Sequence, residues 1–109
     1  MVIATAASSP FGSLTRTRAL LALSLMTETY PRELARVLDA PLFSVQKGLA
    51  SLERDGLVAS RLLGRTRLYA LNPRYLASRE LREYLERLAG REFELRRRVG
   101  ADKGSGFRR

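Results

Sequence analysis

The apolar residues of this chain change their spacing several times, and each change marks a predicted element. From Leu14 to Met26, leucines recur at helical spacing, and Ser13 before them can cap the first turn. This predicts a helix with more apolar positions than a single core-facing stripe needs. We expect it either to be buried all round or to contact a second subunit with one face.

Two further helices follow with a short connection between them. Pro31 suits the first position of a helix, and the apolar face after it, formed by Leu34, Val37 and Leu38, ends at Asp39. The next helix opens at Pro41 and stops at Asp55-Gly56. Its buried face is formed by apolar residues at helical spacing: Leu42, Val45, Leu49 and Leu52. Helices separated by about three residues cross steeply, as in a helix-turn-helix.

Two strand-like runs come next, over residues 57–63 and 66–71. Gly64 and Arg65 lie between them, and the glycine permits the positive φ of a hairpin tip. Asn72-Pro73 then restarts helix, with an apolar face formed by Leu81, Tyr84, Leu85 and Leu88. The predicted fold class is mainly α with a small β-hairpin (α+β), arranged as a winged helix-turn-helix.

Composition indicates one domain. A 45% hydrophobic content over 109 residues supports one core. We expect a flexible N-terminal arm over residues 1–12, the folded domain with its C-terminal dimerisation helix over residues 13–99, and a disordered basic tail over residues 100–109. We recognise neither a secretory signal nor a membrane span, so a cytoplasmic, nucleoid-associated protein is expected.

The chain contains no cysteine and no histidine. Disulfides, thiol nucleophiles, imidazole metal ligands and the usual general base at neutral pH are therefore excluded. A site made only of carboxylates remains conceivable, but the acidic residues lie mostly beside arginine on helical surfaces. We expect no enzyme, no catalytic or metal-binding residue, and no cofactor.

The net charge of +9 is distributed unevenly along the chain. Between Pro41 and Tyr75, six basic residues stand against two acidic ones, and over residues 91–109 seven stand against three. A coding bias towards arginine would explain why arginine replaces lysine, but not why the charge clusters. The clustering favours a nucleic-acid partner over a merely solvated surface.

The helix that begins at Leu42 carries small, amide, hydroxyl and cationic groups opposite its apolar face, which suit contacts to base edges and phosphates. Arginines near the hairpin tip suit phosphate or minor-groove contact, although they could simply keep an edge hairpin soluble. The predicted DNA-binding residues are Phe43, Ser44, Gln46, Lys47, Ser51, Arg54, Arg61, Arg65 and Arg67.

Over about residues 11–88 the chain resembles the ArsR-like winged-helix transcriptional regulators. The segments that carry the resemblance are FGSLTRTRALLAL, RELARVLDAP, SVQKGLASLERDGLV and RLLGRTRLYALNP. The resemblance implies base-facing Ser44, Gln46 and Lys47, wing arginines Arg65 and Arg67, and a homodimer formed by the first and last helices. The expected interface residues are Leu14, Leu21, Leu25, Leu81, Leu85 and Leu88.

Metal-sensing members of that family use cysteine, histidine and acidic clusters, so any effector here is expected to be organic or a protein. The expected function is a sequence-specific, double-stranded-DNA-binding regulator that acts as a dimeric repressor. Two alternatives stay open: a winged-helix protein-interaction module and a non-sequence-specific nucleic-acid-binding protein. Strong salt dependence of duplex binding argues against the first, and a preference for one duplex over random sequence argues against the second.

Overall fold

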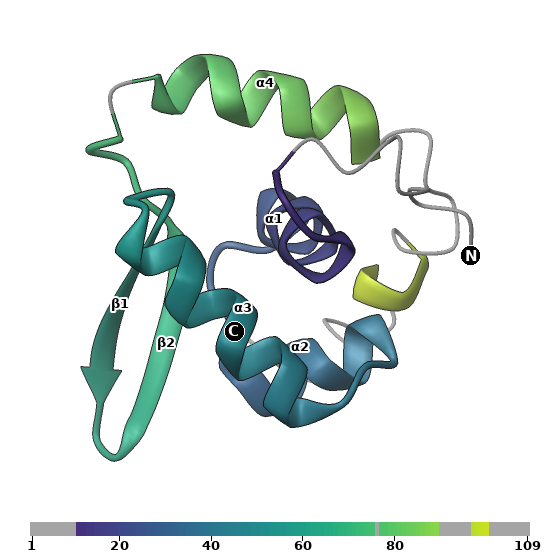
Figure 1. Ribbon diagram of the computed structural model, residues 1–109, viewed down its shortest axis with the longest axis vertical. Coiled ribbons are helices and arrows are strands. Elements are labelled where there is room, and N and C mark those ends of the chain that lie inside the picture. The colour runs from purple at the N-terminus through teal and green to yellow at the C-terminus, as the bar shows by residue number, and fades with distance from the viewer. Residues whose placement is uncertain (1–10, 76, 90–96, 101–109) are drawn as a thin grey trace.

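The computed structural model of the protein describes residues 11–75, 77–89 and 97–100. In chain order its elements are α1 (Leu14–Leu25), α2 (Pro31–Leu38), α3 (Leu42–Arg54), β1 (Val58–Leu63), β2 (Thr66–Leu71) and α4 (Ser78–Ala89) (Figure 1). Helices with one antiparallel hairpin confirm the predicted α+β class. The predicted arm over residues 1–12 and tail over residues 100–109 lie almost wholly outside the described residues.

Helix α1 runs through the centre of the molecule. It packs against α4 on one side and against α2 and α3 on the other (Figure 1). Residues 19–23 are all 0% exposed, so for this stretch the expectation of a helix buried all round is confirmed. The Ser13 hydroxyl accepts a hydrogen bond from the Arg16 amide at 3.1 Å, which is the predicted cap. The helix ends at Leu25, one residue earlier than predicted.

The central position of α1 corrects part of the predicted dimer surface. Leu21 of α1 and Leu85 of α4 are both 0% exposed and belong to the core of the subunit. The prediction that they lie in a dimer interface is therefore wrong for the folded chain. The helical pattern predicted more apolar positions than one core-facing stripe needs, and these positions are covered because α1 has neighbours on both sides.

Helices α2 and α3 lie in the two segments for which the sequence predicted helices. Pro31 occupies the first turn of α2, and Asp39 ends the helix in the left-handed region with φ 53°. The Ala40 amide donates to the Ala35 carbonyl at 3.0 Å, which closes the turn. Pro41 precedes α3, whose buried residues are Val45, Gly48, Leu49 and Leu52.

The hairpin pairs Val58 with Leu71 at its base and Leu63 with Thr66 at its tip. Gly64 has the expected positive φ, 64°, at the turn. The hairpin projects from the body of the molecule as a narrow ribbon (Figure 1). Its base is fixed by Thr29, whose amide and carbonyl both pair with the backbone of Tyr69, at 2.9 and 2.7 Å. The segment before α2 therefore pairs with β2, which no local pattern predicted.

The C-terminal end of α2 is capped by guanidinium groups from distant parts of the chain. Arg98 donates from Nε to the Val37 carbonyl at 2.6 Å and from Nη2 to the Arg36 carbonyl at 2.7 Å. Arg18 of α1 donates to the carbonyl of Leu38. Cationic donors at this end satisfy carbonyls that lack helical partners and match the helix dipole.

Candidate nucleic-acid interface

The outer face of α3 is exposed, as the sequence predicted. Phe43 is 70% exposed, and the Lys47 ammonium nitrogen lies 5.5 Å from the centre of its ring, in a cation–π contact. The exposed residues of the helix are Phe43, Gln46, Lys47, Ala50, Glu53 and Arg54. The exposed Phe43 ring next to the Lys47 side chain makes this face suited to binding another molecule.

Ser51, also predicted to contact DNA, has a different setting. It is half-buried, and its hydroxyl accepts a hydrogen bond from Nη1 of Arg16 at 2.5 Å. The same guanidinium nitrogen lies 2.7 Å from the Asp55 carboxylate, and Arg16 Nε donates to the Phe11 carbonyl at 2.6 Å. Arg16 thus ties the start of α1 to the end of α3. Sequence reasoning missed it, because its partners lie 35 and 39 residues away.

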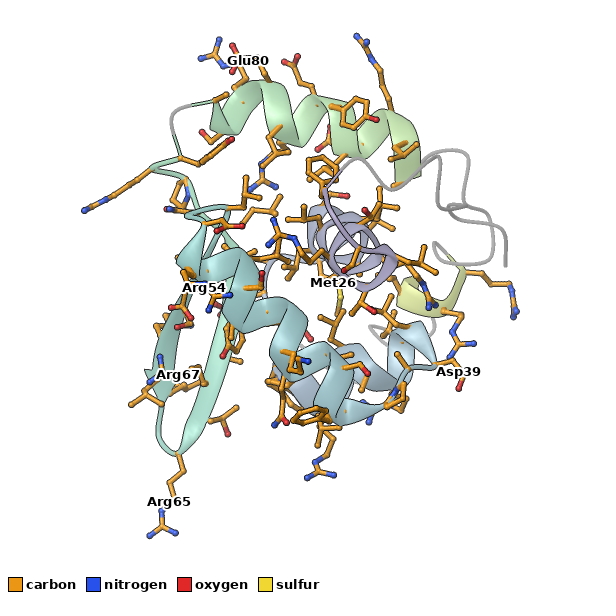
Figure 2. The ribbon with its side chains drawn as sticks, in the orientation of Figure 1. Met26, Asp39, Arg54, Arg65, Arg67 and Glu80 are labelled. Carbon is orange, nitrogen blue, oxygen red and sulfur yellow. The ribbon has the colours of Figure 1, made fainter. Side chains whose placement is uncertain are left out.

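The three arginines predicted on the hairpin have distinct environments. Arg61 forms an ion pair with Glu28, with 2.6 Å between Nη2 and Oε1. The hydrogen bond and the charge of Glu28 raise the pKa of Arg61. Arg67 donates to the Ser60 hydroxyl at 2.9 Å. Arg65 extends from the hairpin turn away from the body (Figure 2) and has no hydrogen bond or ion pair within the described residues.

A relay of hydrogen bonds connects the hairpin to α3. Arg67 donates to Ser60, and the Ser60 hydroxyl donates to the Glu53 carboxylate at 2.7 Å. Tyr69 lies nearby on β2. Burial raises its pKa above the ordinary 10.0, the Glu53 carboxylate raises it further, and Arg67 acts in the opposite direction. The relay holds the hairpin beside one flank of α3.

Two leucines near the hairpin tip are unexpectedly exposed. Leu62 and Leu63 are each 59% exposed, and Arg65 and Arg67 are close to them in the chain. Successive side chains of a strand point to opposite faces, so the tip presents one leucine on each side. Each leucine is therefore a separate exposed apolar side chain among the arginines of the projecting hairpin.

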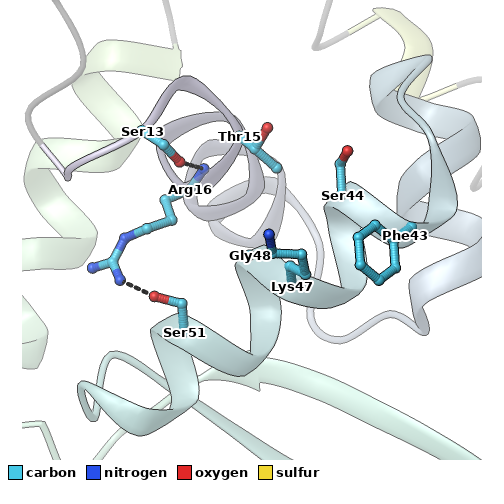
Figure 3. A pocket seen from close by; sticks show the side chains of 8 residues that line it. All are labelled: Ser13, Thr15, Arg16, Phe43, Ser44, Lys47, Gly48 and Ser51. Carbon is cyan, nitrogen blue, oxygen red and sulfur yellow. Dashed lines mark hydrogen bonds between the residues drawn. The ribbon is translucent and has the colours of Figure 1, made fainter.

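A hollow of about 330 Å³ lies between the start of α1 and α3 (Figure 3). It is lined by Ser13, Thr15, Arg16, Phe43, Ser44, Lys47, Gly48 and Ser51. A Cβ atom added to Gly48 would lie 3.2 Å from the methyl group of Thr15, so the glycine lets the two helices approach closely. Among the described residues, the lining contains hydroxyls and cations and no carboxylate.

The remaining predicted dimer residues vary in exposure. Leu14 is 43% exposed, whereas Leu25, Leu81 and Leu88 are half-buried against the core. Tyr84, beside them on α4, is exposed and packs its ring 6.0 Å from that of Phe11. This leaves a modest apolar surface around the ends of α1 and α4.

In the part of the chain that the structure describes, no His, Cys, Asp or Glu cluster could hold a metal ion. No helix in these described ranges is long and apolar enough to cross a membrane. Comparison with protein-family models, with curated proteins and with solved structures finds no match for the chain. The features of the structure that bear on function are therefore the exposed face of α3 and the projecting hairpin.

Proposed function

We propose that the protein is a sequence-specific, double-stranded-DNA-binding transcriptional regulator with a winged helix-turn-helix. Helices α2 and α3 would be the helix pair, with α3 as the recognition helix, and the β1–β2 hairpin would be the wing. The observation that carries this proposal is the exposed outer face of α3 beside a projecting hairpin. The arginine at the hairpin turn, Arg65, has no hydrogen bond or ion pair among the described residues.

The dimensions of α3 support this role. Its 13 residues span about 20 Å at about 1.5 Å per residue, and a major groove about 12 Å wide admits a helix. Gln46 can pair bidentately with adenine, and Arg54 can donate to guanine or to phosphate. Phe43 offers an apolar surface to a thymine methyl group.

The hairpin supports the same role by its charge. Arg65 extends from the turn into solvent, where its guanidinium can reach a phosphate or the minor groove. The Glu53–Ser60–Arg67 relay fixes the hairpin relative to α3, so both would meet DNA in one orientation.

We propose further that the protein acts as a homodimer and represses transcription by occupying promoter DNA. The exposed surface of Leu14 and Tyr84 is the part of the subunit that supports a contact between copies. In a two-fold dimer the two α3 helices would enter major grooves about 34–36 Å apart, and the operator would be a palindrome.

Selection of bound duplexes from a random pool, followed by sedimentation of the enriched complex, tests this proposal. The expected result is a palindromic consensus bound by two copies of the chain. A pool that shows no enrichment, with equal affinity for every duplex, would contradict sequence-specific recognition.

A protein-interaction module is the second candidate, and the exposure of Leu62 and Leu63 favours it. Such a module has no reason to bind duplex DNA with strong salt dependence. Duplex affinity measured over a salt series therefore separates the two proposals, because phosphate contacts release counterions and protein docking through leucines does not.

A further inference from the structure

Helix α3 has two flanks, and each faces a different part of the molecule. Glu53 lies on one flank and contacts the hairpin through Ser60. Ser44 and Ser51 lie about 160–180° around the helix axis from Glu53, at about 100° per residue, on the flank that lines the hollow with α1. The exposed outer face is between these flanks. The hairpin therefore lies beside one flank of α3, and the start of α1 lies beside the opposite flank.

A major groove also has two sides, each formed by a sugar–phosphate backbone. A helix placed in the groove with its outer face towards the bases turns one flank to each backbone. If the hairpin side of α3 meets one backbone, the hollow between α1 and α3 opens towards the other. This step rests on the function proposed above.

The lining of the hollow suits a phosphate group. Thr15 and Ser44 have hydroxyls without a hydrogen-bond partner among the described residues, and Lys47 supplies a cation from α3. Arg16 contributes less charge, because its guanidinium is already paired with Asp55 at 2.7 Å. Hydroxyl and ammonium donors around a space without carboxylates are the groups that proteins direct at DNA phosphates.

We propose that this hollow holds a phosphate of the DNA backbone on the side of α3 opposite the hairpin. Lys47 neutralises its charge, and the hydroxyls of Thr15 and Ser44 donate hydrogen bonds to its oxygens. This assigns Lys47 to a phosphate and not to a base edge, the contact that the family resemblance implied. Gln46, which does not line the hollow, keeps the base-reading role.

The test uses the full chain and the duplex selected as described above. Lys47→Ala should weaken binding to selected and random duplexes by the same factor, about tenfold, and lower the salt slope by roughly one per subunit. Ser44→Glu should weaken both duplexes at least as much, because it places a carboxylate in the hollow. Arg82→Gln, on the exposed face of α4, makes the same change in net charge as Ser44→Glu and should leave affinity nearly unchanged.

Neutral methylphosphonate linkages locate the contact. Replacing phosphates one at a time should reveal a linkage whose neutralisation weakens the wild-type protein but not Lys47→Ala. A second linkage should be one whose neutralisation no longer weakens binding by Arg65→Ala. The two linkages should lie on opposite sides of the major groove. The phosphate assignment is wrong if neutralising each linkage weakens Lys47→Ala as much as it weakens the wild-type protein. It is also wrong if Lys47→Ala reduces discrimination between duplexes, as Gln46→Ala should.

Inorganic phosphate distinguishes a backbone phosphate from a small anionic ligand. Titration followed by NMR should show only weak binding at Ser44 and Lys47 in the absence of DNA. Tight binding of free phosphate that Lys47→Ala abolishes, with duplex affinity unchanged, would make the hollow a small-anion site and overturn the inference. A wild-type protein that binds no duplex at any salt concentration defeats the proposed function and this inference together. Duplex binding with an unchanged salt slope in Lys47→Ala defeats this inference alone.

Discussion

Arg61 on β1 and Glu28, in the connection between α1 and α2, are joined by two hydrogen bonds. Nη2 of Arg61 lies 2.6 Å from Oε1 and Nε lies 3.2 Å from Oε2 of the carboxylate. This fork-to-fork pair compensates the charge of an arginine that the sequence assigned to DNA. It also attaches the hairpin to the segment that leads into α2.

The hairpin arginines should therefore contribute unequally to DNA binding. Arg65→Ala should weaken binding to all duplexes and lower the salt slope by roughly one per subunit, because its guanidinium has no partner within the described residues. Arg61→Ala should have a smaller effect, since the charge it removes is already paired with Glu28. Duplex affinity measured over a salt series for both variants makes the comparison.

Glu28→Gln provides the matched control for that comparison. Loss of the carboxylate releases the charge of Arg61, so affinity for all duplexes should rise and the salt slope should increase. Equal losses in Arg61→Ala and Arg65→Ala, with no gain in Glu28→Gln, would show that the Glu28–Arg61 pair opens when DNA binds.

Gln46→Ala should reduce discrimination between duplexes and leave affinity for random sequence nearly unchanged. A lost bidentate contact to a base typically costs about 1–3 kcal/mol of discrimination. Gln46 is exposed on α3, so the fold should be retained. Competition between the selected duplex and single-base variants measures the effect. Uniform weakening of cognate and random duplexes would remove Gln46 from the base-reading face.

Leu14→Glu should shift the proposed dimer towards monomer without unfolding the subunit. Leu14 is 43% exposed at the start of α1, so a carboxylate there stays in water in the monomer but is buried in an interface. Sedimentation at several protein concentrations measures the change, with thermal unfolding as the control. A wild-type protein that remains monomeric at every concentration and on the selected duplex contradicts the dimer.

Leu85→Ala should instead act on folding. Leu85 is fully buried in the core between α4 and its neighbours, and truncation of such a leucine typically costs about 2–5 kcal/mol. The free energy of unfolding in urea measures this loss. A loss below about 1 kcal/mol would show that α4 packs loosely on α1.

Stability should fall in alkaline solution partly because of Tyr69. Its pKa in the folded protein is raised above 10.0, chiefly by burial, so the fold favours the neutral phenol. The stability that this provides is complete below pH 10 and is lost as the pH rises through the higher folded pKa. Unfolding free energies between about pH 9 and pH 11.5 should decline more steeply for wild type than for Tyr69→Phe. Parallel curves would exclude the contribution.

Local signals in the sequence identified most of the elements. The cap at Ser13, the end of the helix at Asp39 and the positive φ of Gly64 each depend on a few neighbouring residues, and each was predicted correctly. The left-handed conformation of Asp39 was not predicted. The exposed face of α3 followed from helical periodicity alone. The core position of Leu21 did not, because periodicity shows that a residue is apolar but not how many neighbours cover it.

Long-range pairs account for what the sequence could not show. Arg16 contacts Ser51 and Asp55, and Thr29 pairs with Tyr69, over separations that no spacing rule covers. The hollow lies where α1 and α3 approach each other at Gly48. No pattern along the chain therefore predicts the hollow, although Ser44, Lys47 and Ser51 were each predicted as DNA-binding residues.

The guanidinium groups at the end of α2 have a consequence for how the chain acquires its structure. Arg18 precedes α2, whereas Arg98 follows the carbonyls it binds by 61 and 62 residues. This eight-residue helix is too short to be stable alone, so its last turn is completed only when both ends of the domain have come together. Formation of the helix pair is thereby linked to closure of nearly the whole chain, and a fragment ending at Ala89 should yield a frayed α2 whose amides exchange rapidly with solvent.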